Sequence, residues 1–463
     1  MSVLNNAANL ATNITYKPFG GMSSLTYGNG LNGTIGYDNQ YRNTSISAGA
    51  VQNLSYSQYD ANGNITAITN ALDATKNKSF TYDTLDRLAS GTGSWGSLGW
   101  TYDGVGNRQT QTNGGTSTYA YQTGTTKLTG ITGAGSAAFT FDLNGNTATE
   151  NARQYTYNQN QRLIQVVDGA MTAGYTYNGN GQRVKKVVSG VMTIFHYDQR
   201  GQLIGESNSA GAVTAEYVYL NSAPLAKIEG SSVYFYHDDN LGTPQKLTDS
   251  TGAIVWSADY KPFGEATITV STITNNLRFS GQYYDAETGL NYNYFRDYNP
   301  IIGRYIEADP IGIEEGVNHL YAYVGSNPIM RIDPQGLKWV WNCKRRLSWA
   351  TSPLVSSLFP IFGHCYIKFG DEPLGFYSDG SANWRVYDER TPGTSTQDGG
   401  ERTLIINRYC LPSWVSDCEY DCLKSKNVVG AQGATVGGSP LSNNCCTNLD
   451  AVKKECKKKC CGK

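Results

Sequence analysis

The segment Tyr102-Asp103-Gly104-Val105-Gly106-Asn107-Arg108 is one copy of a motif that recurs through the first half of the chain. Each copy has a Tyr-Asp or Tyr-Asn pair, a turn rich in Gly and Asn, and a strand-like run of polar and apolar residues. Further copies begin at Tyr37, Tyr59, Tyr82, Phe141, Tyr157, Tyr177 and Tyr197, mostly 16 to 23 residues apart, with a degenerate copy at Tyr121. Such regular self-similarity predicts a repetitive fold.

Each copy is expected to form a β-hairpin. The alternation in Tyr175-Thr176-Tyr177, a turn, and then Arg183-Val184 is typical of strand, turn and strand. Asn-Gly and Asp-Gly pairs supply the positive φ angles that tight hairpin turns need. Because a single hairpin is marginal in water, the copies must pair edge to edge into one continuous sheet.

Composition narrows the class of protein. The 463 residues include 52 Gly and 33 Tyr, and 12% are aromatic, which is too many for a disordered chain. With 37 basic and 38 acidic residues, the overall charge gives no argument for nucleic-acid binding. No apolar run is long enough for a membrane-spanning helix, and residues 1–10 lack the features of a classical signal peptide.

Cysteine and charge divide the chain near residue 337. All ten cysteines lie at or after Cys343. Residues 338–463 carry 17 basic and 12 acidic residues, whereas residues 1–337 carry 20 and 26. We therefore expect two modules of different origin, joined near Gly336 and Leu337.

The repeats resemble the YD repeats of bacterial Rhs proteins, of insecticidal toxin-complex C subunits and of the related teneurin shell. Residues 234–337 resemble the Rhs repeat-associated core through an ordered series of motifs. These are Tyr236-His237-Asp238-Asp239-Asn240-Leu241-Gly242, Tyr260-Lys261-Pro262-Phe263-Gly264, Tyr294-Phe295-Arg296-Asp297-Tyr298, Gly303-Arg304-Tyr305-Ile306-Glu307-Ala308-Asp309-Pro310 and Asp333-Pro334-Gln335-Gly336-Leu337. The resemblance implies a mainly β fold: a spiral YD-repeat shell, here partial because few repeats are visible, with a core plug. The chain is then a C-terminal piece of a longer gene, an orphan cassette or a partial shell.

The same resemblance implies an aspartyl self-protease that cuts after the Asp-Pro-x-Gly-Leu signature. Matched by motif, its two aspartates are Asp309 and Asp333, with Arg296 assisting, and the cut falls between Leu337 and Lys338. Two close carboxyl groups can share one proton while the ionised one activates water, and an arginine can hold one of them ionised through a bidentate contact. The alternative is that both Asp-Pro pairs only form turns. We expect three domains: the shell (1–233), the core (234–337) and a C-terminal effector (338–463).

The effector is expected to be a small, cysteine-rich α+β domain. Strands are predicted over residues 362–369, 374–380 and 403–407, and helices over 411–426 and from about 445 to 459. His364 is the single histidine there, so a cysteine nucleophile would use it as base. Cys445 and Cys446 follow two Asn residues at a predicted helix start, where the helix dipole lowers a thiol pKa. The order of these groups resembles the circularly permuted papain-like cysteine hydrolases, with Cys446 slightly preferred as nucleophile over Cys445.

A purely structural role of the cysteines stays open as an alternative. Cys418 and Cys422, and Cys456 and Cys460, have the spacing of disulfide-stapled helices. No metal or other cofactor is expected, because one histidine and no Cys-x-x-Cys pair suit zinc poorly. The Lys453–Lys459 run is typical of a solvated helix face.

The sequence therefore predicts an Rhs-type polymorphic toxin, delivered out of the cell, whose effector acts on peptide or acyl bonds in a periplasmic or extracellular target. Its expected partners are a cognate immunity protein and a secretion apparatus or toxin-complex components, with no nucleic acid and no membrane span. The alternatives are a non-enzymatic surface or adhesive protein with a stapled binding domain, and a nuclease effector.

Overall fold

A computed structural model describes residues 3–5, 8–18, 21–312 and 319–337, together with the backbone of five strands further along the chain. The chain divides into two compact units, Met1–Asn342 and Cys343–Lys463. In the described part no helix is long and apolar enough to cross a membrane. Short 3-10 turns are the helical elements there: η1 (Ala74–Lys76), η2 (Phe279–Gly281) and η3 (Val324–Ser326).

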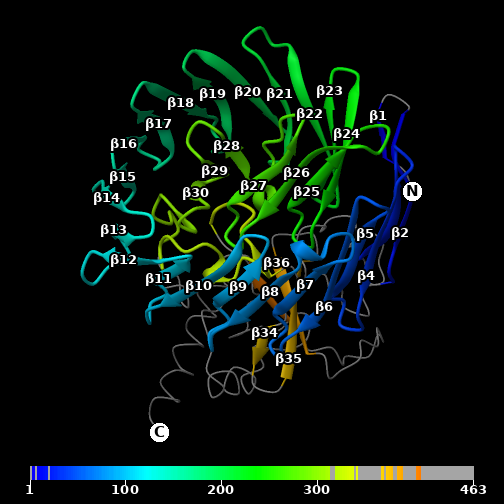
Figure 1. The fold of residues 1–463 in the computed structure, drawn as a ribbon, viewed down its shortest axis with the longest axis horizontal. Helices are drawn as coiled ribbons and strands as arrows, with labels where there is room; N and C mark the ends of the chain where they lie inside the picture. The colour runs from blue at the N-terminus through cyan, green and yellow to red at the C-terminus, as the bar shows by residue number, and fades with distance from the viewer. Residues whose placement is uncertain are drawn as a thin grey trace, which may run out of the picture. The chain divides into compact units, whose positions relative to one another are not determined.

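The first unit is built on one antiparallel sheet of 27 strands in which each strand pairs with the next along the chain. Figure 1 shows these strands following one another in sequence order around β28–β30. The strands are β1 (Val3–Asn5), β2 (Ala8–Tyr16), β3 (Met22–Tyr27), β4 (Asn32–Tyr37), β5 (Asn43–Ala48), β6 (Gln52–Tyr59), β7 (Ile65–Asn70), β8 (Lys78–Tyr82), β9 (Leu88–Gly93), β10 (Gly96–Tyr102), β11 (Arg108–Asn113), β12 (Thr116–Tyr121), β13 (Leu128–Gly133), β14 (Ala137–Phe141), β15 (Thr147–Glu150), β16 (Arg153–Tyr157), β17 (Leu163–Asp168), β18 (Met171–Tyr177), β19 (Arg183–Val188), β20 (Val191–Tyr197), β21 (Leu203–Ser207), β22 (Val213–Leu220), β23 (Ala223–Glu229), β24 (Ser232–Asp238), β25 (Pro244–Thr248), β26 (Ile254–Tyr260) and β27 (Ala266–Ser271). The prediction of a mainly β, continuous antiparallel sheet is confirmed.

Each repeat turn is organised by the Asp or Asn that follows the tyrosine. In the copy at Tyr102, the Asp103 carboxylate accepts hydrogen bonds from the backbone N–H of Val105 (3.0 Å) and of Asn107 (2.8 Å). Gly106 has a φ of 93°, and the ladder register shifts between Thr101 and Tyr102. The loop is thus a five-residue turn closed by a bulge, in which the aspartate side chain adds two hydrogen bonds to the backbone bonds from Asp103 to Asn107 and from Gly106 to Asp103. The predicted hairpins are present, with longer turns than the Asn-Gly pairs suggested.

The repeat tyrosines link successive hairpins. The Tyr177 hydroxyl donates to the backbone carbonyl of Leu163 (2.7 Å), and the Tyr197 hydroxyl donates to that of Arg183 (2.9 Å). Tyr82, Tyr102, Tyr121 and Tyr219 make the same bond to a carbonyl 13 to 17 residues earlier. The ring fills the inner face while the hydroxyl is satisfied by the preceding repeat, which explains why this position is tyrosine.

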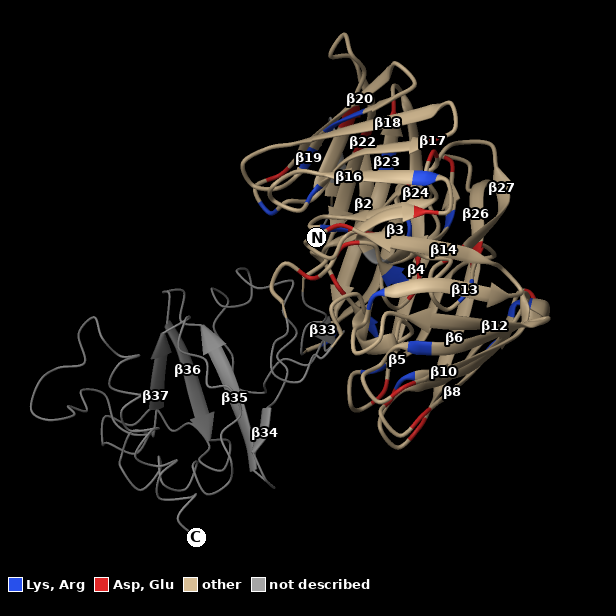
Figure 2. Ribbon diagram, turned by 90° about the vertical axis from the view of Figure 1, so that its left-hand side faces the viewer, with Lys and Arg blue, Asp and Glu red and all other residues tan. Residues whose placement is uncertain are grey.

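The sheet curls far enough for its first strands to contact its last ones. The Gln52 side chain donates to the Asp238 carbonyl (2.7 Å), and Lys76 forms an ion pair with Asp259 (3.1 Å). Leu10 and Phe235 lie in one apolar cluster, although 225 positions separate them in the sequence. In the ribbon of Figure 2, few positions along the strands of this unit are coloured as charged residues, and several acidic positions lie in the connecting loops.

Residues 272–312 and 319–337 pack against the inner face of the sheet. They include β28 (Tyr283–Asp285), β29 (Leu290–Asn293), β30 (Arg296–Asn299) and β31 (Arg304–Tyr305), which form a four-stranded sheet, and β32 (Arg331–Ile332), which pairs with β33 (Val340–Trp341). Asp285 is buried and pairs with Arg183 and Lys186 of β19. β24–β27 continue the large sheet without a break, so the domain boundary at residue 234 stays a prediction.

Four strands of the second unit form an antiparallel sheet: β34 (Ile367–Phe369), β35 (Glu372–Ser378), β36 (Asn383–Asp388) and β37 (Thr403–Asn407). Three of them overlap the strands predicted from the sequence, and β36 was not predicted. The predicted helices lie outside the described residues.

Candidate functional site

The Arg296 guanidinium stands at the centre of a buried polar cluster. Its Nη2 lies 3.0 Å from Oδ2 of Asp309 and 3.3 Å from Oδ2 of Asp333. Its Nε donates to the carbonyl of Gly336, and its Nη1 donates to that of Leu320 (3.2 Å). The structure therefore brings together the three residues predicted from their motifs, although one nitrogen joins both carboxylates in place of the expected bidentate contact to one.

Asp333 holds the chain segment that leads to Leu337. Its Oδ1 accepts the backbone N–H of Leu337 at 3.1 Å. Its Oδ2 accepts the hydroxyl of Tyr305 at 2.8 Å, and its backbone carbonyl accepts the side-chain amide of Asn293 at 2.9 Å. The Tyr305 ring also lies against the guanidinium, with its centroid 3.7 Å from the Arg296 Cζ. Tyr305 and Asn293 were missed from the sequence, where nothing separates them from the many other Tyr and Asn residues.

Asp309 is the more accessible of the two carboxylates, with 12% of its side chain exposed against 3% for Asp333. Its Oδ1 accepts the backbone N–H of Ile311 at 3.0 Å, which is the Asx turn that Asp before Pro favours. Its own backbone N–H donates to the Leu320 carbonyl (2.9 Å). The turn role and the contact with Arg296 coexist in the same residue.

Gly336 allows the loop to approach the cluster closely. Its φ is 67°, in the left-handed region, and a Cβ there would lie 3.1 Å from the backbone nitrogen of Arg296 and closer still to the Asn293 carbonyl. A side chain would push the loop away from Arg296. The glycine of the Asp-Pro-x-Gly-Leu motif is therefore required by both conformation and space.

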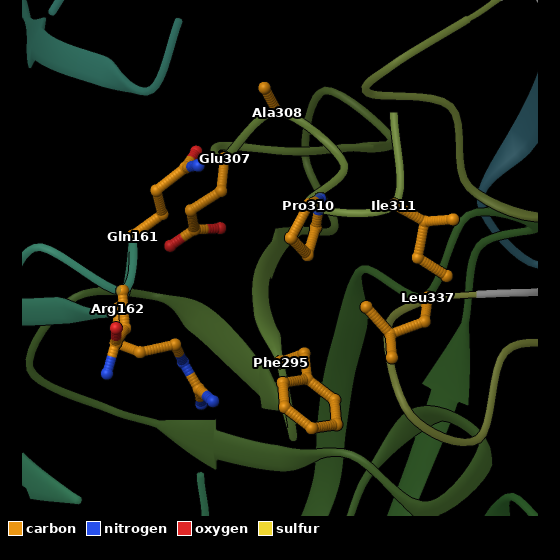
Figure 3. A pocket seen from close by; sticks show the side chains of 9 residues that line it. Gln161, Arg162, Phe295, Glu307, Ala308, Pro310, Ile311 and Leu337 are labelled. Atoms are coloured by element: carbon orange, nitrogen blue, oxygen red, sulfur yellow. The ribbon is translucent and has the colours of Figure 1, made fainter. Parts of the chain in front are cut away.

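A pocket of about 280 Å³ adjoins the cluster (Figure 3). Its walls are mostly apolar and include Phe295, Pro310, Ile311 and Leu337, and its polar lining includes Arg162 and Glu307. Arg162 donates to the carbonyls of Gly181 (2.7 Å) and Tyr294, and packs on the Phe295 ring. The side chain of Leu337 thus forms part of a cavity wall beside the predicted cleavage point.

Asp297 and Glu307 form a second pair of buried carboxyl groups, which the sequence did not predict. Both are almost fully buried, and Oε2 of Glu307 accepts the backbone N–H of Asp297 at 2.8 Å. Burial raises the pKa of Asp297 to about 6. Burial, and then the nearby Asp297 carboxylate, raise the pKa of Glu307 well above its usual range.

The remaining predicted site residues lie outside the described residues: Lys338, His364, Cys445 and Cys446. Within the described part of the chain, no group of three His, Cys, Asp or Glu side chains is arranged to hold a metal ion.

The sequence matches the family model described as Teneurin YD-shell over residues 34–329. Among characterised relatives, the tRNA3(Ser)-specific nuclease WapA of Bacillus spizizenii is 30% identical over 280 residues, which is 56% of this chain and 12% of that protein. The double-stranded DNA deaminase toxin A of Burkholderia cenocepacia is 41% identical over 133 residues, 28% of this chain and 9% of that protein. The chain therefore spans about a tenth of the length of these relatives.

Among solved structures, the crystal structure of TcdB2-TccC3 superposes with a TM-score of 0.56 at 22% identity, covering 72% of this chain and 20% of that one. The Tc holotoxin pore of Photorhabdus luminescens, with the TccC3 mutation D651A, gives 0.55 at 22% identity, covering 71% and 19%. These likenesses concern the fold. Because the family match covers more than half of the sequence, the chain belongs to the Teneurin YD-shell family of Rhs-type YD-repeat proteins.

Proposed function

We propose that this chain is part of an Rhs-type polymorphic toxin whose core cuts its own backbone between Leu337 and Lys338. The observation that carries the proposal is the position of Arg296, Asp309 and Asp333 around the Gly336–Leu337 segment. One carboxylate and the arginine bind the backbone on the amino-terminal side of the cut. The segment is therefore held in place before any reaction starts, as intramolecular catalysis requires.

The hydrogen bonds of Asp333 and Asp309 indicate which of the two carboxylates can act as the base. Asp333 uses Oδ1 for the Leu337 N–H and Oδ2 for Tyr305, so it acts mainly by positioning. Asp309 is more exposed and can take a proton from a water molecule that attacks the Leu337 carbonyl carbon. Arg296 keeps both carboxylates close together despite their repulsion.

The released part, residues 338–463, is proposed to be the toxic effector. On sequence grounds its reaction is that of a cysteine hydrolase, with Cys446 or Cys445 as nucleophile and His364 as base. The named activities of two relatives, a tRNA nuclease and a DNA deaminase toxin, support a toxin and make a nucleic-acid-directed effector the main alternative. A cognate immunity protein and assembly with toxin-complex components, as the TcdB2-TccC3 likeness suggests, complete the proposal.

Two experiments test these parts separately. Amino-terminal sequencing of the smaller fragment of the purified chain should begin at Lys338; another start would place the cut elsewhere. Expression of residues 338–463 should be toxic and should lose toxicity in a Cys445→Ser, Cys446→Ser double variant. Toxicity that survives in this variant but is lost on neutralising Lys453–Lys459 would favour a nuclease or a membrane-binding effector.

A further inference from the structure

Peptide hydrolysis by carboxyl groups needs one group that is ionised and one that carries a proton. In the Arg296 cluster, the four carboxylate oxygens of Asp309 and Asp333 all face donors. Oδ1 of Asp309 accepts the N–H of Ile311 and its Oδ2 accepts from Arg296. Both oxygens of Asp333 likewise accept hydrogen bonds, from Leu337, Tyr305 and Arg296. Because each of these oxygens already faces a donor, neither aspartate is placed to donate a proton before the reaction starts, and the initial acid must be sought elsewhere.

Glu307 has the surroundings of a carboxylic acid. Only 1% of its surface is exposed, and it lies next to Asp297, which is 2% exposed. Its Oε2 accepts the Asp297 N–H, whereas its Oε1 makes no hydrogen bond to the described residues. Two cations act on this pair, and both are engaged elsewhere: Arg162 in the pocket wall directs nitrogens at the backbone carbonyls of Gly181 and Tyr294, and Arg183 is paired with Asp285. Two buried carboxyl groups with so little compensation retain a proton, in keeping with the raised pKa of Glu307.

Glu307 also shares a cavity with the predicted cleavage point. Figure 3 shows Glu307 and Leu337 on opposite sides of the pocket, with Pro310 between them. A volume of about 280 Å³ can hold several water molecules at about 30 Å³ each, enough to join the two walls by hydrogen bonds. Glu307 is also two residues before Asp309 in the same segment, so acid and base are carried by one loop.

We infer that Glu307, and neither aspartate of the Arg296 cluster, supplies the proton for the leaving amine when the Leu337–Lys338 bond is cut. This inference rests on the proposed self-cleavage. The oxygen of one water molecule bonds to the Leu337 carbonyl carbon, and a proton of that water passes to Asp309. The C–N bond breaks, and the Glu307 proton passes through water in the pocket to the nitrogen. The Asp309 proton later leaves to solvent and Glu307 takes one up, so that one water molecule is consumed.

The test measures the cleavage rate of the full chain against pH. The chain is purified in denaturant, refolded by dilution at a series of pH values, and followed by intact mass. In the wild type the rate should fall at high pH, where Glu307 loses its proton. Glu307→Gln should slow cleavage by about 100-fold or more and abolish that fall, and Glu307→Asp should restore part of the rate.

The matched control is Glu206→Gln. Glu206 is also a buried carboxylate, held by the hydroxyls of Tyr217 (2.7 Å) and Tyr283 (3.2 Å), but it does not line the pocket. This variant should be cut with the wild-type pH profile. Asp297→Asn is a second probe: because it removes the neighbouring negative charge, it should move the high-pH fall to lower pH, which a purely structural role of Glu307 would not do.

The outcomes separate the two proposals. A wild type that stays uncut at every pH would show that self-cleavage is wrong, and the role of Glu307 would fall with it. A wild type that is cut, with Glu307→Gln cut equally fast at every pH, would refute only the proton donor. If Glu307→Gln does not refold, the Asp297→Asn variant gives the test. A cleavage rate that falls at the same high pH in this variant as in the wild type would refute the role of Glu307 as proton donor.

Discussion

The carboxylate of Asp333 accepts the backbone N–H of Leu337 at 3.1 Å. The first residue of the Asp-Pro-x-Gly-Leu motif thus binds its last residue, and the five residues of the motif form a compact loop against Arg296. The predicted cut follows directly after Leu337, so this hydrogen bond holds the backbone next to the bond that is expected to break.

The two aspartates should differ when they are replaced. Asp309→Asn removes the proposed base and should abolish cleavage with little effect on folding, because its side chain is partly exposed. Asp333→Asn should also stop cleavage but should lower the thermal unfolding temperature further, because it weakens three hydrogen bonds in a buried site. Intact mass and thermal melts of both variants check this. Efficient cleavage in Asp309→Asn would contradict its role as base.

Arg296→Lys should leave the chain folded but uncut. A lysine ammonium cannot reach the Gly336 carbonyl and both carboxylates in the planar arrangement that the guanidinium provides. Arg296→Met should be less stable still, because it leaves the buried Asp333 carboxylate and the partly exposed Asp309 carboxylate without a cation, at a cost of about 3–5 kcal/mol in the free energy of unfolding. Urea denaturation of the two variants gives the comparison. Equal stability of both would argue against the ion pairs.

Gly336→Ala should reduce cleavage and stability together. A positive φ costs alanine about 1 kcal/mol, and the new Cβ also meets the Arg296 nitrogen and the Asn293 carbonyl. Gly289→Ala is the matched control: its φ of 73° is similar, but a Cβ there meets nothing within 4 Å. Both variants carry the cost of a positive φ, so the difference in their stability measures only the steric contact of the new Cβ with the Arg296 nitrogen and the Asn293 carbonyl. Identical losses would mean that the space beside Gly336 is not limiting.

Loss of a repeat tyrosine hydroxyl should weaken the sheet. Tyr177→Phe removes the hydrogen bond to the Leu163 carbonyl and leaves that buried acceptor unsatisfied, which costs about 1–3 kcal/mol. Tyr234→Phe is the control, because the Tyr234 hydroxyl makes no hydrogen bond within the described residues. Thermal melts should show a lower unfolding temperature only for Tyr177→Phe, and a similar loss in both would mean that the linking bond is unimportant.

Acidic pH should have opposing effects on stability. The pKa of Asp297 is raised to about 6 in the folded chain, so the folded state binds more protons and stability falls as pH rises from about 4 to about 6. Burial lowers the pKa of His237 and of His319 to about 3. Below about pH 6.5 the unfolded chain therefore binds protons that the folded chain does not, and the free energy of unfolding decreases as pH falls. Relative to the wild type, Asp297→Asn should therefore gain stability as pH rises through 4 to 6. Thermal melts across that range check this, and a constant difference would contradict the raised pKa.

The repeats and the cluster could be predicted because their signals are local. The Tyr-Asp pair and the glycine-rich turn recur within a few residues, and Asp309, Asp333 and Arg296 each sit in a distinctive motif. The turn type was harder to predict, because it depends on which backbone N–H groups the Asp103 carboxylate binds, and residue type alone does not show this.

The supporting residues could not be predicted, because they meet only through the tertiary fold. Asp297 and Glu307 are ten positions apart on segments that pair in space, and nothing in their neighbours indicates burial. Asn293 reaches the Asp333 carbonyl across 40 positions. The contacts of Gln52 with β24 likewise depend on how far the sheet curls, which the repeat count did not reveal.

The most direct test of the self-cleavage is the intact mass of the purified full-length chain beside that of Asp333→Asn. We predict two masses for the wild type, corresponding to residues 1–337 and 338–463, and a single uncut mass for the variant. A single uncut mass for both proteins, or two masses for both, would contradict the account.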